Sequence, residues 1–247
     1  MSIVELKHLK SLKIKKMTRI KISAALIIAA IIMPSMLKAQ DVKYLQVVQG
    51  GKVKSHYDIT QVDSVIFGTL PANVAVINGV AWAKYNVDAP GTFTTNIYDY
   101  GMFYQWNRPT GWSNSDPLVN HQGGTVWDNS TPTGTTWETS NNVCPTGFRV
   151  PTISELASLL DSESVWEQKG DVWGRTFGSG DNTLFMPASG YRNYSDGALL
   201  NQSSSGFYWS SSHYFSNLAH YLYFYSVNVR VNYYSRTFGF SVRCVSE

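Results

Sequence analysis

The sequence has very few cysteines and no long apolar run. Its 247 residues include only Cys144 and Cys244, and neither lies directly after the apolar segment 22–33, so attachment of a lipid to an N-terminal cysteine is excluded. That segment has 12 residues, whereas a helix needs about 20 to cross a bilayer. Charged residues are also scarce, at 15%, against 43% hydrophobic and 14% aromatic residues. This composition indicates a packed globular protein.

The charge is distributed unevenly along the chain. Residues 1–39 hold eight of the 20 Lys and Arg residues and one of the 17 acids. The remaining 12 basic and 16 acidic residues give residues 40–247 a net charge of about −4. A basic surface for nucleic acid or membrane is therefore not expected, and we predict no nucleic-acid partner.

Residues 1–39 have the three parts of a secretory signal. A cationic stretch ends at Lys21, the apolar segment follows, and Pro34 and Ala39 precede Gln40. We expect cleavage near Gln40, no retained membrane span and export to the periplasm, the cell surface or the medium. The alternative is a retained anchor, and Met17 is the alternative start codon.

Both cysteines lie in the part expected to be exported. In an oxidising compartment an even pair is more often a bridge than two free thiols. A bridge would close a loop of about 100 residues and stabilise the fold by about 4 to 5 kcal/mol.

Two modules follow the signal. Residues 42–48 and 52–57 are β-rich and flank Gly50-Gly51, and a third β-rich run covers residues 62–67. Residues 40–70 therefore predict a small β-hairpin module, joined by a linker at 71–74 to a domain at 75–247. In that domain Asn78-Gly79 predicts a tight hairpin between residues 74–77 and 80–83.

The polar stretch 107–142 predicts a long loop, pinned by Trp112, Trp127 and Trp137. A helix should begin at Thr152, which forms a capping box with Glu155, and should end near residues 161–164. Its expected apolar stripe contains Leu156, Leu159 and Leu160. The strands expected after Gly170 are 183–187, 206–212, 219–226, 227–231 and 238–245.

The helix start belongs to a larger motif. The segment 144–152, CPTGFRVPT, with Glu155 resembles the signature of the Fibrobacter succinogenes major paralogous domain. Further segments resemble that family in the same order along the chain. They are WAKYNV at 82–87, Tyr100-Gly101 with Tyr104 and Trp106, PASGYR at 187–192, GFYWSS at 206–211 and GFSVRCV at 239–245.

This resemblance implies an α+β, C-type-lectin-like domain, with mostly antiparallel strands, long loops and one or two helices. In that fold a bridge links the start of a helix to the last strand, which is where Cys144 and Cys244 fall. The fold alone does not identify a ligand, because one fold can carry many different binding sites.

Motifs for familiar chemistry are missing from the sequence. The calcium-binding motifs of lectins with this fold do not occur, and the histidines after residue 39 have no metal-ligand spacing. No nucleophile, base and orienting group can be assembled. We therefore predict a protein that is not an enzyme and has no cofactor and no metal site.

Tyrosines are concentrated near the C-terminus, with seven of the 15 in residues 207–234. In the strand expected at 219–226, alternation places Leu222 and Phe224 on one face and three tyrosines on the other. In the next strand Val227, Val229 and Val231 should share one face. Tyrosine, serine, asparagine and arginine are typical of binding surfaces, although tyrosine is also an ordinary strand residue. The predicted ligand-binding residues are Tyr214, His220, Tyr221, Tyr223, Tyr225, Asn228, Arg230, Asn232, Tyr233 and Tyr234.

The same region resembles the C-terminal variable region of target proteins of diversity-generating retroelements. That resemblance implies variation between copies at positions among His213, Tyr214, Ser216, Asn217, His220, Tyr221, Tyr223, Tyr225, Asn228, Arg230, Asn232, Tyr233 and Tyr234.

These observations favour an exported, non-catalytic binding protein for a protein or glycan ligand. The alternative is a structural or adhesive subunit that joins a surface assembly through residues 41–70. An enzyme is the third class, and a turnover lost on changing either cysteine would indicate it.

Overall fold

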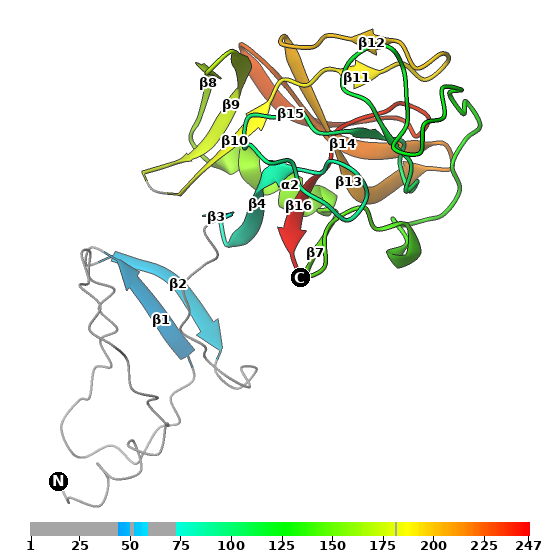
Figure 1. Ribbon diagram of the computed structural model, residues 1–247. Helices are drawn as coiled ribbons and strands as arrows, with labels where there is room; N and C mark the ends of the chain where they lie inside the picture. The colour runs from blue at the N-terminus through cyan, green and yellow to red at the C-terminus, as the bar shows by residue number, and fades with distance from the viewer. Residues whose placement is uncertain (1–43, 50–51, 59–72, 181) are drawn as a thin grey trace, which may run out of the picture. The chain divides into compact units, whose positions relative to one another are not determined.

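A computed structural model describes residues 44–49, 52–58, 73–180 and 182–247. The chain divides into two compact units, Met1–Gly68 and Thr69–Glu247 (Figure 1). In the first unit, β1 (Tyr44–Gln49) and β2 (Lys52–Asp58) form the expected antiparallel hairpin. The third β-rich run at 62–67 and the signal at 1–39 lie outside the described residues.

The described part of the second unit consists mostly of antiparallel strands with one short α-helix. One sheet has the order β3-β4-β16-β7, two others are β10-β9-β8 and β13-β14-β15, and β5-β6 and β11-β12 are two-stranded. The elements are β3 (Val74–Ile77), β4 (Val80–Asn86), β5 (Phe103–Tyr104), β6 (Gly111–Trp112), η3 (Thr139–Asn141), β7 (Phe148–Arg149), α2 (Ile153–Ser158), η4 (Leu159–Asp161), β8 (Ser164–Lys169), β9 (Val172–Ser179), β10 (Asn182–Pro187), β11 (Tyr191–Arg192), β12 (Leu199–Leu200), β13 (Ser205–Phe215), β14 (Leu218–Tyr225), β15 (Asn228–Ser235) and β16 (Arg243–Ser246).

The predicted β3–β4 hairpin is confirmed. Asn78 and Gly79 both have positive φ, 49° and 82°, as the central residues of a two-residue hairpin turn require. The register pairs Ile77 with Val80 directly across this turn.

Helix α2 begins as its sequence predicts. The Thr152 hydroxyl accepts from the Glu155 N–H at 3.3 Å, and a Glu155 carboxylate oxygen accepts from the Thr152 N–H at 2.7 Å. Leu156 and Leu159 are buried, but the expectation for Leu160 is wrong because its side chain is 38% exposed. The α-helix ends at Ser158 and continues as the 3₁₀ turn η4, whose three residues per turn rotate Leu160 outward.

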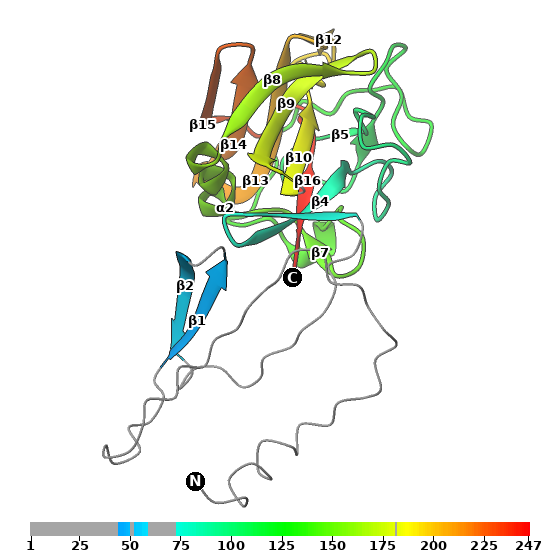
Figure 2. The same ribbon diagram turned by 90° about the vertical axis from the view of Figure 1, so that its left-hand side faces the viewer.

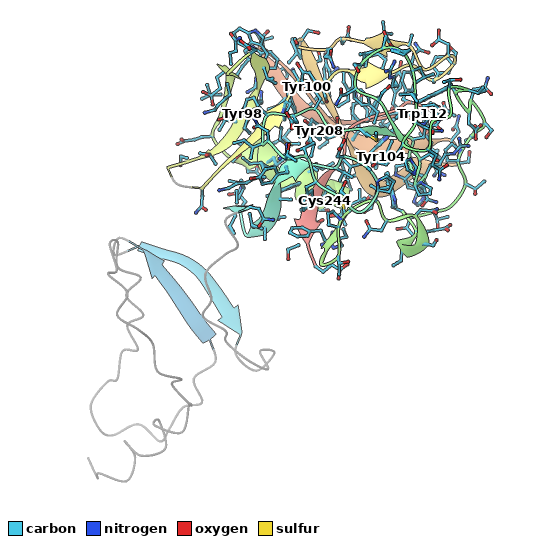
Figure 3. The ribbon with its side chains drawn as sticks, in the orientation of Figure 1. Tyr98, Tyr100, Tyr104, Trp112, Tyr208 and Cys244 are labelled. Carbon is cyan, nitrogen blue, oxygen red and sulfur yellow. A yellow bond between two sulfur atoms is a disulfide. The ribbon has the colours of Figure 1, made fainter. Side chains whose placement is uncertain are left out.

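The Cys144–Cys244 disulfide is confirmed. It joins the segment before α2 to the last strand, β16, across a sequence separation of 100 residues. Both cysteines are buried, and Cys244 lies inside the second unit (Figure 3). No helix among the described residues is long and apolar enough to cross a membrane.

The long loop at 107–142 is confirmed, apart from β6 and η3. Trp112, Trp127 and Trp137 are buried as expected. Two buried arginines from elsewhere also hold this loop. Arg192 donates to the carbonyls of residues 113, 115 and 197, and Arg236 donates to those of residues 132, 134, 215 and 218.

Two strand predictions need correction. The strands β8 and β9 were not expected, and with β10 they form a meander. Residues 238–242, expected to be part of a strand, instead make isolated bridges to three different elements, through Gly239, Phe240 and Ser241. Only Arg243–Ser246 forms the regular strand β16.

Candidate binding surface

The tyrosine-rich segment folds into the sheet β13-β14-β15, in which β15 lies at one edge. The register sets Tyr225 opposite Asn228, Tyr223 opposite Arg230 and Tyr221 opposite Asn232. Directly opposed side chains lie on the same face of a sheet. We call this set the tyrosine face, and its members are Tyr221, Tyr223, Tyr225, Asn228, Arg230, Asn232 and Tyr234.

The other face of the sheet belongs to the core. Leu222 and Phe224 are fully buried, as alternation predicts, and Val229 and Val231 pack against the same cluster. Helix α2 contacts all three strands of this sheet (Figure 2). The expectation for Val227 is wrong: it lies in the turn between β14 and β15 and is 79% exposed.

Tyr221 does not face solvent, which corrects the expectation that three tyrosines line up outside. Its side chain is 5% exposed, and its ring centroid lies 4.9 Å from that of Phe240 and 5.9 Å from that of Phe207. Burial raises the pKa of Tyr221 to about 12. A second core cluster, which includes Tyr221, covers this end of the tyrosine face, so Tyr221 belongs to the core and is not exposed to a ligand.

Tyr223 and Tyr225 remain half-buried, with ring centroids 5.5 Å apart. Next to them the Arg230 guanidinium carbon lies 5.3 Å from the centroid of the Tyr223 ring, a cation–π contact. In the described part of the chain Arg230 makes no ion pair. Arg230 is exposed and carries a permanent positive charge.

Three of the predicted site residues form a separate cluster. The alternation of β14 and β15 places His220 and Tyr233 on the face opposite Arg230. Tyr214 of β13 stacks on Tyr233 with 3.9 Å between ring centroids, and lies 5.1 Å from the His220 ring. Burial lowers the pKa of His220, which favours an uncharged ring at neutral pH. The ten predicted residues are thus divided between two faces.

An open pocket of about 430 Å³ lies where β14 begins and β15 ends. It is lined by Tyr194, Leu218, Tyr233, Tyr234, Ser235 and Phe238. Four of these residues were not predicted as site residues. Tyr194 and Phe238 come from loops, and their ring centroids lie 5.1 Å apart. No periodic pattern in the sequence connects Tyr194 with β15, so only the fold reveals this pocket.

A buried arginine holds the other end of the tyrosine face. Arg175 of β9 donates to the carbonyl oxygens of Tyr225 at 2.9 Å and of Ser226 at 3.3 Å. These are the first residues of the turn that places Asn228 beside Tyr225. The surface is therefore fixed at both ends by side chains from other elements.

Acidic side chains are scarce in this region. Among the described residues there is no group of three or more His, Cys, Asp or Glu side chains that could hold a metal ion. From residue 197 to residue 246 the sequence has no Asp, Glu or Lys. Arg236 and Arg243 are buried, so Arg230 is the exposed charge of this segment.

Comparison with known proteins gives one partial match. A family model described as a domain of unknown function, DUF8237, matches residues 163–245. The matched segment extends from β8 into β16 and includes the whole tyrosine face. No curated protein matches the chain, and no solved structure does.

Proposed function

We propose that this protein is an exported, non-catalytic ligand-binding protein that uses the tyrosine face of a C-type-lectin-like domain. The fold assignment is supported by the motifs that resemble the Fibrobacter succinogenes major paralogous domain. It is also supported by the Cys144–Cys244 bridge, which joins the segment before α2 to β16 as that resemblance implies. The signal-like residues 1–39 support export, and a disulfide suits an oxidising compartment.

One observation carries the binding proposal: Tyr223, Tyr225 and Arg230 lie together on a sheet whose opposite face is buried. Tyrosine supplies a large contact area for little rotamer entropy, and arginine and tyrosine are enriched among residues that dominate binding energy. Arg175 holds one end of the tyrosine face and the core cluster around Tyr221 holds the other, and a preorganised surface loses less entropy on binding.

Variation between copies forms part of this proposal. The positions that resemble the variable region include every member of the tyrosine face. Tyr221 differs from the others because it is buried, so we expect it to vary less than Tyr223 and Tyr225. Sequencing copies of the gene, together with a search for a neighbouring reverse transcriptase, tests this interpretation.

The binding proposal is tested with two probes used in parallel, a glycan array and a library of random 12-residue peptides on phage. The full chain is compared with the double variant Tyr223→Ala/Tyr225→Ala. We expect at least one set of ligands whose binding weakens about tenfold or more in the double variant. Tyr98→Ala is the matched control, because Tyr98 is also a half-buried tyrosine but packs on Phe185 of β10, outside the tyrosine face. Tyr98 is labelled in Figure 3. Ligands that bind both proteins equally, or no ligands at all, contradict the proposal.

A further inference from the structure

The edge of the sheet narrows the type of ligand that fits this surface. Strand β15 pairs only with β14 among the described residues, and in Figure 2 it lies at the margin of the sheet. An unpaired strand edge presents main-chain N–H and C=O groups at regular spacing. A polypeptide in an extended conformation matches that spacing, and a glycan does not.

The hairpin geometry shows which groups face outward. A two-residue turn makes Tyr225 and Asn228 a hydrogen-bonded pair, so alternate residues of β15 direct their main-chain groups away from β14. These residues are Val229, Val231 and Tyr233. The Tyr233 N–H agrees with this assignment, since it donates to the Asn232 side-chain oxygen at 2.9 Å and not to β14. A strand added at Tyr233 replaces this local bond.

Two recognition features include side chains of β15. Arg230 is exposed and has no carboxylate partner among the described residues, so it can pair with an acidic group of a ligand. The pocket that includes Tyr234 and Phe238 is lined mainly by aromatic and aliphatic side chains, which suits an apolar side chain. Tyr234 is four residues beyond Arg230, or about 13 Å along a strand.

We infer that β15 docks an extended polypeptide segment of a partner protein, which adds to the sheet as a further strand. The segment carries an Asp or Glu that pairs with Arg230 and an apolar residue that enters the pocket. Residues four apart in a strand point to the same side, so these two residues are four positions apart. The inference rests on the proposed binding function and specifies its ligand.

Charge reversal tests this inference directly. The probe is the library of random 12-residue peptides, selected on the full chain and on the variants Arg230→Glu and Tyr234→Ala. Peptides selected by the unaltered chain should be enriched in an acidic residue four positions from Leu, Ile, Met or Phe. Arg230→Glu should weaken their binding about tenfold or more and should select Lys or Arg at the acidic position. Tyr234→Ala should select peptides that keep the acidic residue but no longer require an apolar residue four positions from it. Lys84→Glu, which changes a charge on β4, is the matched control and should select the same peptides as the unaltered chain.

Main-chain pairing is tested on the peptide, so the fold of the protein is untouched. Methylation of alternate amide nitrogens should abolish binding in one register and leave it within about threefold in the other. Equal binding in both registers overturns strand addition.

The outcomes separate this inference from the proposed function. If peptides or glycans bind through Tyr223 and Tyr225 without any response to Arg230→Glu, the inference is wrong and the binding function stands. A dimer of the chain that Arg230→Glu dissociates would make a second copy the occupant, and also overturns the inference. If nothing depends on Tyr223 and Tyr225, both proposals fail together.

Discussion

Tyr221 and Leu222 are neighbours in β14 and point to opposite faces of the sheet, yet their side chains are only 5% and 0% exposed. At this position the sheet is therefore covered on both faces by core. Four residues further on, Tyr225 is half-buried. A single strand thus changes from an interior element to a surface element along its length.

This gradient predicts different costs for truncating tyrosines of the same strand. Tyr221→Ala should lower the free energy of unfolding by about 3 to 5 kcal/mol, since it leaves a cavity against Phe207 and Phe240. Leu222→Ala should cost about 2 to 5 kcal/mol for the same reason. Tyr225→Ala should cost about 1 kcal/mol or less. Chemical denaturation of the three variants measures these values, and a Tyr225→Ala protein as unstable as Tyr221→Ala would contradict the gradient.

The disulfide should contribute much of the stability. Replacing both Cys144 and Cys244 with alanine should lower the free energy of unfolding by about 4 to 5 kcal/mol, because the bridge closes a loop across 100 residues. Changing both residues avoids a free thiol. Thermal melting measures the loss, and alkylation of the unreduced protein followed by intact mass checks the bridge. Two modified cysteines without reductant would show that it is absent.

The capping carboxylate predicts a pH dependence. Hydrogen bonds from the Arg149 guanidinium, at 2.6 and 2.8 Å, outweigh partial burial and, with those from Thr152, lower the pKa of Glu155 in the folded chain. A lowered folded pKa gives stability that is complete above the ordinary value of 4.5 and is lost as the pH falls through the folded value.

The comparison of Glu155→Gln with the unaltered chain isolates this contribution. The unaltered chain should be the more stable at pH 7, and the difference should shrink as the pH falls below about 4.5. Melting temperatures measured from pH 7 to pH 3 test this. Thr152→Ala, which removes the other half of the capping box, should cost about 1 kcal/mol. A constant difference between Glu155→Gln and the unaltered chain at all pH values would argue against the shift.

Replacing Arg236 with lysine should destabilise the protein, although the change keeps the positive charge. Its guanidinium lies 4.2 Å from the Trp106 ring centroid and donates to four main-chain carbonyls. Lysine cannot reproduce this planar array of donors, so Arg236→Lys should cost about 2 to 4 kcal/mol. Exposed Arg230→Lys should change stability by less than about 0.5 kcal/mol. Denaturation of both variants provides the comparison, and equal small effects would show that the carbonyl contacts contribute little.

Local features could be predicted from the sequence because they depend on neighbouring residues. Asn78-Gly79, the Thr152 capping box and the burial of Leu222 and Phe224 all follow from turn chemistry or alternation. The burial of Tyr221 could not be predicted in this way. It depends on Phe240 and Phe207, which reach it only through the tertiary fold, and alternation cannot show that both faces of a sheet are covered. The pocket at Tyr194 and the strands β8 and β9 were missed for the same reason, since long-range packing determines them.

The buried arginines bind mainly to backbone carbonyls. Arg192, Arg236, Arg175 and Arg243 each donate to at least two main-chain oxygens of distant segments. Every residue type carries a carbonyl, so these contacts do not depend on which side chains the held segments display. The loops and turns around the sheet are therefore free to change their side chains during evolution while keeping their course, provided that the four arginines remain.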